Sequence, residues 1–235
     1  MRWSTIGTRR LTLRPCAGEC DGDEPGQLTV AITRDATLDW MNRFAGEMSE
    51  HRQELVALDT AIGDGDHGTN MNRGMTKAVE RLGAAEQADV GAVLKTVAMA
   101  LVSTVGGAAG PLYGTLFLQM GNALAGQEDV DLPSYAAAWR KGLEGVQARG
   151  KAQPGDKTMV DALIPAVDAL EGASDLDDGL RTAAQAAEEG MKATTPLLAR
   201  KGRASYLGER SEGHQDPGAT STYYLFKSAA ETLAA

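Results

Sequence analysis

Apolar residues recur every three or four positions from Ala31 onward, the spacing that places them on one face of an α-helix. In the first such stretch, Leu38, Met41, Phe44 and Met48 share a face. Runs in which apolar and polar residues alternate, as they do in half-buried strands, are absent. The sequence therefore predicts an all-α fold. Counting two segments that are apolar nearly all round, the predicted helices lie at about 33–55, 69–83, 88–105, 111–126, 133–148, 157–172, 178–199 and 217–234.

Residues 1–29 differ from the rest of the chain because they show neither helical nor strand periodicity. Their four Arg balance four Asp and Glu, and Gly and Pro interrupt them, so we predict a disordered or non-native leader. Val30 is a candidate for the true start of translation, which N-terminal sequencing of the native protein would test. Residues 30–235 fit one domain, since about 100–200 residues form a domain.

The composition excludes several classes of partner. With a formal net charge of −9, the chain lacks the clustered Lys and Arg that nucleic acid or an anionic membrane requires. No apolar run approaches the roughly 20 residues that span a bilayer, and the N-terminus lacks the apolar core of a signal peptide. We therefore expect a cytoplasmic protein. Cys16 and Cys20 are too few for a disulfide framework or a zinc site, so we interpret them as incidental thiols.

Three carboxylates, those of Asp59, Asp64 and Asp66, lie within eight residues in a glycine-rich segment. Like charges this close repel one another unless a cation lies between them. Mg²⁺ is a hard cation that takes one or two carboxylates together with substrate phosphates, so the sequence predicts a Mg²⁺ site. A solvated acidic turn is the alternative. A calcium-binding EF-hand does not fit, because the Glu at its twelfth position is missing.

The glycines of this segment point to a phosphate ligand beside the metal. Gly63, Gly65 and Gly68 permit positive φ and let backbone amides approach phosphate oxygens. Thr69 and Asn70 then open a predicted helix, whose N-terminal amides and dipole favour an anion.

Two further loops carry residues suited to phosphate. The segment 145–152 resembles a P-loop, but Ala152 stands where Ser or Thr should hold Mg²⁺ and a helix precedes it, which excludes that fold. The loop that follows offers Lys157 and Thr158 as polar contacts, while Asp156 and Thr158 alternatively cap the next helix. Local pattern leaves these two interpretations open.

A polar segment of about twenty residues, 200–219, separates the last two predicted helices, and loops above roughly 12–15 residues are usually functional or disordered. Its Arg200, Lys201, Arg203 and Arg210 suit phosphate or an acidic partner. For the first two, complementing a helix C-terminus is the alternative.

Four separated blocks carry a resemblance that covers about residue 31 to the C-terminus. They read LDTAIGDGDHGTNMNRGM, GGAAGPLYGTLFLQMG, RGKAQPGDKTMVDALIPA and KGRASYLGERSEGHQDPGATS. Together they resemble the nucleotide-binding L subunit of dihydroxyacetone kinases that use phosphoenolpyruvate, and the equivalent C-terminal domain of the ATP-dependent enzymes. The leader has no counterpart in that family.

This resemblance implies an eight-helix antiparallel barrel in which loops at one end hold ADP or ATP. Asp59, Asp64 and Asp66 would bind two Mg²⁺ ions and, with Arg203, serve phosphoryl transfer. Ala109 departs from the family, which commonly has Ser there, and the lost hydroxyl is worth about 1.5–3 kcal/mol at most. The implied nucleotide contacts are His67, Gly68, Thr69, Asn70, Ala108, Ala109, Gly150, Met159, Arg203, Asp216, Pro217 and Gly218.

The resemblance also implies the reaction and the partners. The L subunit keeps ADP as a bound coenzyme, receives phosphate from a phosphohistidine donor, the M subunit, and passes it to dihydroxyacetone held on the K subunit. A homodimer is predicted as well. Three alternatives remain: an L-type subunit that uses exchangeable ATP or serves another short ketose, a nucleotide-loaded regulatory module, and a structural helical bundle that binds no nucleotide.

Overall fold

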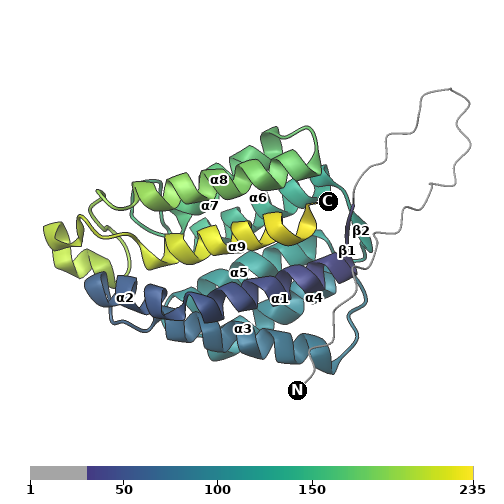
Figure 1. Cartoon of the computed structure of the whole chain (residues 1–235), viewed down its shortest axis with the longest axis horizontal. Coiled ribbons are helices and arrows are strands. Elements are labelled where there is room, and N and C mark those ends of the chain that lie inside the picture. Colours follow the sequence, from purple (N-terminus) through teal and green to yellow (C-terminus); the bar gives the residue numbers. More distant parts are fainter. Residues whose placement is uncertain (1–30, 235) are drawn as a thin grey trace, which may run out of the picture.

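The structure of the chain, a computed structural model, describes residues 31–234 and is almost entirely helical (Figure 1). The leader predicted at 1–29 lies outside the described residues. No helix of the described range has the length and apolar character needed to cross a membrane. Its elements are β1 (Ile32–Thr33), α1 (Arg34–Glu50), α2 (Arg52–Ile62), α3 (His67–Ala84), α4 (Val90–Thr104), α5 (Ala109–Ala123), β2 (Asp129–Val130), α6 (Leu132–Gly150), α7 (Val160–Gly172), α8 (Leu176–Ala193), the 3₁₀ helix η1 (Arg203–Ser211) and α9 (Pro217–Leu233).

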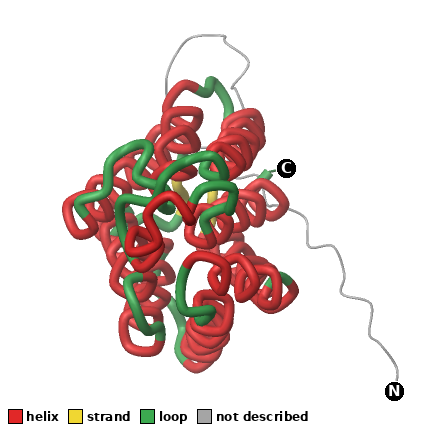
Figure 2. Tube along the Cα trace, turned by 90° about the vertical axis from the view of Figure 1, so that its left-hand side faces the viewer, coloured by secondary structure: helices red, strands yellow, loops and turns green. Residues whose placement is uncertain are grey.

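Eight of the helices form a closed ring. Helices α3 to α9 each pack on the next, α9 packs on α1, and α1 packs on α3. Helix α2 continues α1 towards the end of the barrel where most of the long loops gather, and Figure 2 looks onto that end. The predicted all-α, eight-helix antiparallel barrel is confirmed.

The interior of the ring is filled by the apolar positions whose spacing predicted the helices. Trp139 of α6 and Phe226 of α9 stack there with ring centroids 4.2 Å apart, and Trp40 of α1 lies against Trp139. Trp40 Nε1 donates to Leu225 O and Ser228 Oγ, so the buried ring keeps its polar atom satisfied. Truncating a buried aromatic residue costs about 3–5 kcal/mol, so this cluster is a main source of the barrel's stability.

Some element boundaries differ from the predictions. The helix predicted at 33–55 is two helices, because the chain breaks at His51 and resumes as α2 up to Ile62. Asp59 therefore lies in the last turn of a helix and not in the loop that follows. The helix predicted at 178–199 ends at Ala193, and the segment 200–219 contains η1.

Asp156 does not cap the helix that follows it, contrary to that part of the prediction. Its carboxylate accepts the Gln153 N–H at 2.8 Å, and the N-cap of α7 is Met159, whose side chain makes no cap bond. The side-chain caps of the barrel are made by Thr33, Asp89, Asp131, Asp175 and Asp216.

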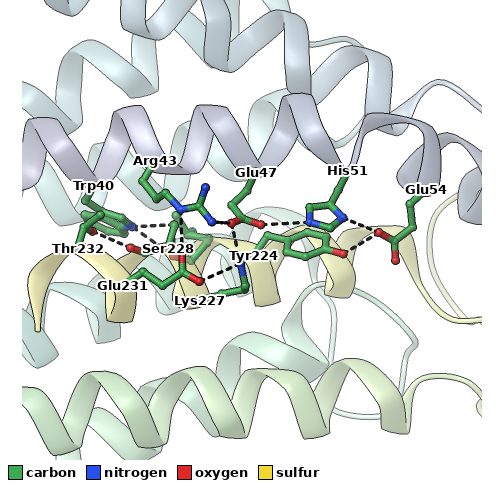
Figure 3. Close-up of polar contacts among 11 residues, drawn as sticks. Trp40, Arg43, Glu47, His51, Glu54, Tyr224, Lys227, Ser228, Glu231 and Thr232 are labelled. Carbon is green, nitrogen blue, oxygen red and sulfur yellow. Dashed lines mark hydrogen bonds and ion pairs between the residues drawn. The ribbon is translucent and has the colours of Figure 1, made fainter. Parts of the chain in front are cut away.

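A line of charged side chains fastens α1 to α9 (Figure 3). Glu47 of α1 is fully buried and pairs with Arg43 of its own helix and with Lys227 of α9, at 2.7 Å from the latter. His51 continues the line, with Nε2 3.4 Å from Glu47 Oε2 and Nδ1 2.8 Å from Glu54 Oε2. Tyr224 of α9 stacks on His51 and donates to Glu54 Oε2 at 2.7 Å, so the α1–α2 break is held against α9.

Candidate functional site

The loop end of the barrel contains a cavity of about 420 Å³. This size suits a small ligand, for which pockets of about 300–1,000 Å³ are usual. Its walls come from segments far apart in the sequence: 59–70, 106–113, 146–160, 201–204 and 216–218.

The acidic cluster is folded around Asp59, in the last turn of α2. Asp59 Oδ2 accepts the N–H groups of Asp66 at 2.8 Å and His67 at 3.0 Å, which turns the loop back over the helix. No side chain fits at Gly63, since a Cβ there would lie 2.1 Å from Asp59 Oδ1. One carboxylate oxygen each of Asp59, Asp64 and Asp66 lie within 4.8 Å of one another. Three converging carboxylates fit a hard divalent cation such as Mg²⁺.

Arg203 reaches this cluster from the first residue of η1. Its Nε lies 2.9 Å from Asp64 Oδ2. Because the Arg203 side chain is 67% exposed, the pair contributes little stability, roughly 0–1 kcal/mol. Its significance is positional, since the guanidinium stands beside the carboxylates and at the cavity.

Two helix N-termini open into the cavity without a capping side chain. The N-cap residues of α3 and α5, Asp66 and Ala108, make no side-chain cap hydrogen bond, unlike the capped helices of the same barrel. At α3 the His67 N–H is already taken by Asp59, so only the later amides of that turn remain available, whereas at α5 the Ala109 N–H is open. The helix dipole favours an anion at both ends. The cavity thus places two anion sites beside a cation site.

Most of the residues implied by the resemblance do line this cavity. Gly68 and Thr69 do not: Gly68 is buried against α2, where a Cβ would lie 2.2 Å from Arg52 O, and Thr69 is exposed. The residues that line it are Asp59, Asp64, Asp66, His67, Asn70, Ala108, Ala109, Gly150, Met159, Arg203, Asp216, Pro217 and Gly218.

Behind His67 lies a chain of hydroxyl groups that the sequence did not reveal. His67 Nε2 and Ser221 Oγ share a hydrogen bond of 2.9 Å, and Tyr113 OH lies 2.7 Å from Ser221 Oγ and 3.0 Å from Thr222 Oγ1. Burial lowers the pKa of His67 and raises the pKa of Tyr113 to about 12. These hydroxyls fix the imidazole ring. The only sequence signal was polar side chains on otherwise apolar helices.

Asp216 and Lys157 line the cavity as buried charged residues. The Asp216 carboxylate caps α9 by accepting the Ala219 N–H at 2.7 Å, while burial raises its pKa to about 7. Lys157 donates to three main-chain carbonyl groups, so the interpretation that it contacts phosphate is wrong for this structure.

A closed helical barrel with helix N-termini and an acidic cluster in one cavity defines an all-α protein that can bind phosphate groups and a divalent cation. A family model described as the DAK2 domain matches residues 61–231, and the chain belongs to this family.

Among curated relatives, the chain is 44% identical over 202 residues to an Escherichia coli K12 protein named PEP-dependent dihydroxyacetone kinase, ADP-binding subunit DhaL. The match covers 84% of this chain and 96% of the relative. A Listeria innocua protein named as subunit DhaL of PEP-dependent dihydroxyacetone kinase 1 is 46% identical, with coverages of 86% and 98%. The L-erythrulose 1-kinase of Mycolicibacterium smegmatis is 36% identical, and the match covers 82% of this chain and 34% of that enzyme. The resemblance found in the sequence is confirmed.

Solved structures agree with the fold. The dihydroxyacetone kinase of C. freundii superposes with a TM-score of 0.68 at 24% identity, over 96% of this chain and 39% of that one. The same enzyme in complex with AMP-PNP and Mg²⁺ gives a TM-score of 0.67 at 23% identity, over 96% of this chain and 38% of that one.

Proposed function

We propose that the chain is the ADP-binding subunit of a phosphoenolpyruvate-dependent dihydroxyacetone kinase, a phosphotransferase that acts together with partner subunits. The observation that carries the proposal is the meeting of the three-aspartate cluster, Arg203 and two uncapped helix N-termini in one cavity. The relatives named as ADP-binding subunits support it, since they are 44% and 46% identical over nearly their whole length.

The polar side of the cavity suits the phosphates. Asp59, Asp64 and Asp66 would hold two Mg²⁺ ions, which neutralise phosphate charge when they are bound. The open N-terminus of α5 would donate amide N–H groups to the phosphate oxygens around Ala109, and the dipole of α3 would favour the same anion near His67. Arg203 would stabilise the charge on the transferred group, a role for which a planar guanidinium is suited.

The apolar part of the cavity lining suits the base. Apolar side chains of Leu112, Val146, Met159 and Val160 form it. A flat aromatic base packs well against such a surface, and Gly150 and Gly218 belong to the same lining. The cavity would therefore hold the whole nucleotide.

Partner subunits would supply the phosphoryl donor and the acceptor of this reaction. A phosphohistidine donor, the M subunit, would phosphorylate the resident ADP, and the K subunit would present dihydroxyacetone. Phosphoryl transfer needs in-line positioning and charge neutralisation, which the cavity provides, and an acceptor, which the K subunit brings. The chain should be inactive alone and act in the cytoplasm.

Denaturing the purified protein and identifying what it releases tests the proposal. We expect about one ADP per chain by chromatography and Mg²⁺ by elemental analysis, because a resident coenzyme survives purification. Adding the K subunit and an M subunit that carries phosphohistidine should then phosphorylate dihydroxyacetone without added ATP, with one phosphoryl group transferred per phosphohistidine consumed. A protein that contains no nucleotide and binds added ADP only weakly would contradict the coenzyme role.

A second candidate function is an L-type subunit that consumes exchangeable ATP or serves a four-carbon ketose. The 36% identity to an enzyme named L-erythrulose 1-kinase favours it. Ala109, at the open N-terminus of α5, removes a hydroxyl that could hold a phosphate and so permits faster exchange. Comparing ATP with the phosphohistidine donor, and dihydroxyacetone with erythrulose, separates the two functions.

A further inference from the structure

Lys157 is a buried lysine whose ammonium group contacts only main-chain oxygens at hydrogen-bond distance. Its side chain is among the largest fully buried ones, and the residue is 1% exposed. Nζ donates to Ser211 O at 2.7 Å, Leu197 O at 3.0 Å and Thr195 O at 3.2 Å. Its backbone has φ of 62°, a left-handed conformation that a lysine adopts only when its surroundings require it.

The three acceptors lie at the two ends of one loop, which runs between α8 and α9 and carries η1. Thr195 and Leu197 precede η1, and Ser211 is its last residue. Two other hydrogen bonds join these ends of the loop, which we call its neck. Gly213 N–H donates to Thr195 O at 2.9 Å, and Ala199 N–H donates to Ser211 Oγ at 2.9 Å. Lys157 Nζ therefore lies where the chain segments that enter and leave the loop meet.

The same lysine belongs to the segment between α6 and α7, which also lines the cavity. It lies two residues before Met159, the N-cap of α7, and Asp156 O accepts the Arg200 N–H at 3.0 Å beside it. One residue thus joins the α6–α7 loop to the loop that delivers Arg203 to Asp64.

The ammonium group has no proton left for a ligand. Lysine has three N–H donors, and three carbonyl groups use them all. A buried cation without a hydrogen-bonded carboxylate is costly, and burial lowers the pKa of Lys157 while Asp216 and Glu212 oppose that shift. A methionine would fill the same space without this cost, so the charge serves the carbonyl contacts.

We propose that Lys157 is a positioning residue, which ties the neck of the η1 loop to the cavity wall and thereby holds Arg203 at the phosphate site. This inference rests on the proposed nucleotide site, because nucleotide binding is one of its readouts. The Lys157 ammonium group has no N–H left to offer the ligand, so the residue acts through Arg203.

The test compares Lys157→Met, Arg203→Ala and the double variant, with Lys141→Met as a matched control on the barrel surface. We expect hydrogen exchange of amides 199–211 to become at least tenfold faster in nucleotide-free Lys157→Met. Isothermal titration with Mg²⁺ and ADP should show about tenfold weaker binding in Lys157→Met and almost no further loss when this change is added to Arg203→Ala. The control should match wild type in both measurements.

If the losses of affinity in Lys157→Met and Arg203→Ala are additive, Lys157 does not act through Arg203 and the proposal is overturned. Unchanged hydrogen exchange of amides 199–211 in Lys157→Met would overturn it as well. If Lys157→Met does not fold, Ser211→Ala loosens the same neck from its other side and should increase exchange in the same amides. Its failure to do so also overturns the proposal. If the wild-type protein binds no nucleotide, the proposed function fails. The hydrogen-exchange measurement alone then decides whether Lys157 holds the neck of the η1 loop.

Discussion

At the scale of single residues, the aspartates of the cavity differ because their surroundings differ. Asp59 is held by two backbone amides, and Asp64 is paired with Arg203. Asp216 is buried as a helix cap. The sequence could mark Asp59 and Asp64 because they lie close to Asp66 in a glycine-rich segment, and the family resemblance marked Asp216. The sequence could not show which one stays exposed to bind a cation.

Asp64→Asn should lower nucleotide retention by tenfold or more, because it removes one charge from the cation site and the partner of Arg203. The ADP released per chain on denaturation measures this loss. Asp168→Asn is a suitable control, since Asp168 is an exposed carboxylate that also pairs with an arginine, Arg140, on the barrel surface. Unchanged nucleotide retention in Asp64→Asn would contradict a cation site at these carboxylates.

Asp216 should make the stability of the nucleotide-free protein depend on pH. Burial raises its pKa from 3.8 to about 7, so the folded state holds a proton that the unfolded chain has lost. The free energy of unfolding should therefore fall as pH rises through this window, from about 4 to about 7. Asp216→Asn keeps a capping oxygen but cannot ionise, so relative to wild type it should gain roughly 1–3 kcal/mol between pH 5 and pH 8. Urea unfolding at the two pH values measures the difference, and an equal pH dependence in both proteins would contradict it.

At the scale of the elements, the helices could be predicted because apolar periodicity records which face is buried. The break at His51 could not be predicted, because the apolar periodicity continues across it. The break results from contacts of the two helices with α9 and α3. Helix η1 was missed because it buries only Ser211 and has no apolar stripe. The strands β1 and β2 are two residues each, too short to alternate. The role of Lys157 was missed because carbonyl acceptors leave no trace in a sequence.

The charged line between α1 and α9 should contribute measurably to stability. Glu47→Gln keeps the shape of the side chain but removes the charge that Arg43 and Lys227 share. We expect a loss of about 1.5–3 kcal/mol in the free energy of unfolding, as for a hydrogen bond to a charged group. Urea denaturation measures it. Glu80→Gln, in an exposed pair with Lys77, should change stability by less than about 1 kcal/mol.

At the scale of the whole molecule, charge is distributed unevenly. The chain carries a net charge of −9, yet several cations near the loop end make no ion pair within residues 31–234. They are Arg149, Lys151, Arg200, Lys201 and Arg210. Beside them Tyr206 is 87% exposed on η1. An exposed aromatic side chain among free cations suits a partner with an acidic surface.

Tyr206→Ala should weaken association with the K subunit by about tenfold or more, as truncation of an aromatic anchor does at an interface. Affinity for ADP and Mg²⁺ should stay unchanged, because Tyr206 is not part of the cavity wall. Biolayer interferometry against immobilised K subunit measures the first quantity. The control is Met99→Ala, an exposed apolar residue on α4. Equal effects of the two variants would contradict this placement of the interface, and sedimentation would test the predicted homodimer.

Helix α9 closes the ring against α1 and supplies Ser221 beside His67, while residues 216–218 form one wall of the cavity. During synthesis, the segment that carries the aspartates leaves the ribosome long before this wall does. A growing chain can therefore fold its first helices but cannot enclose a nucleotide until α9 has emerged. The ligand would then bind only after α9 has been synthesised. Chains stalled before that point would remain without ligand and accessible to proteases.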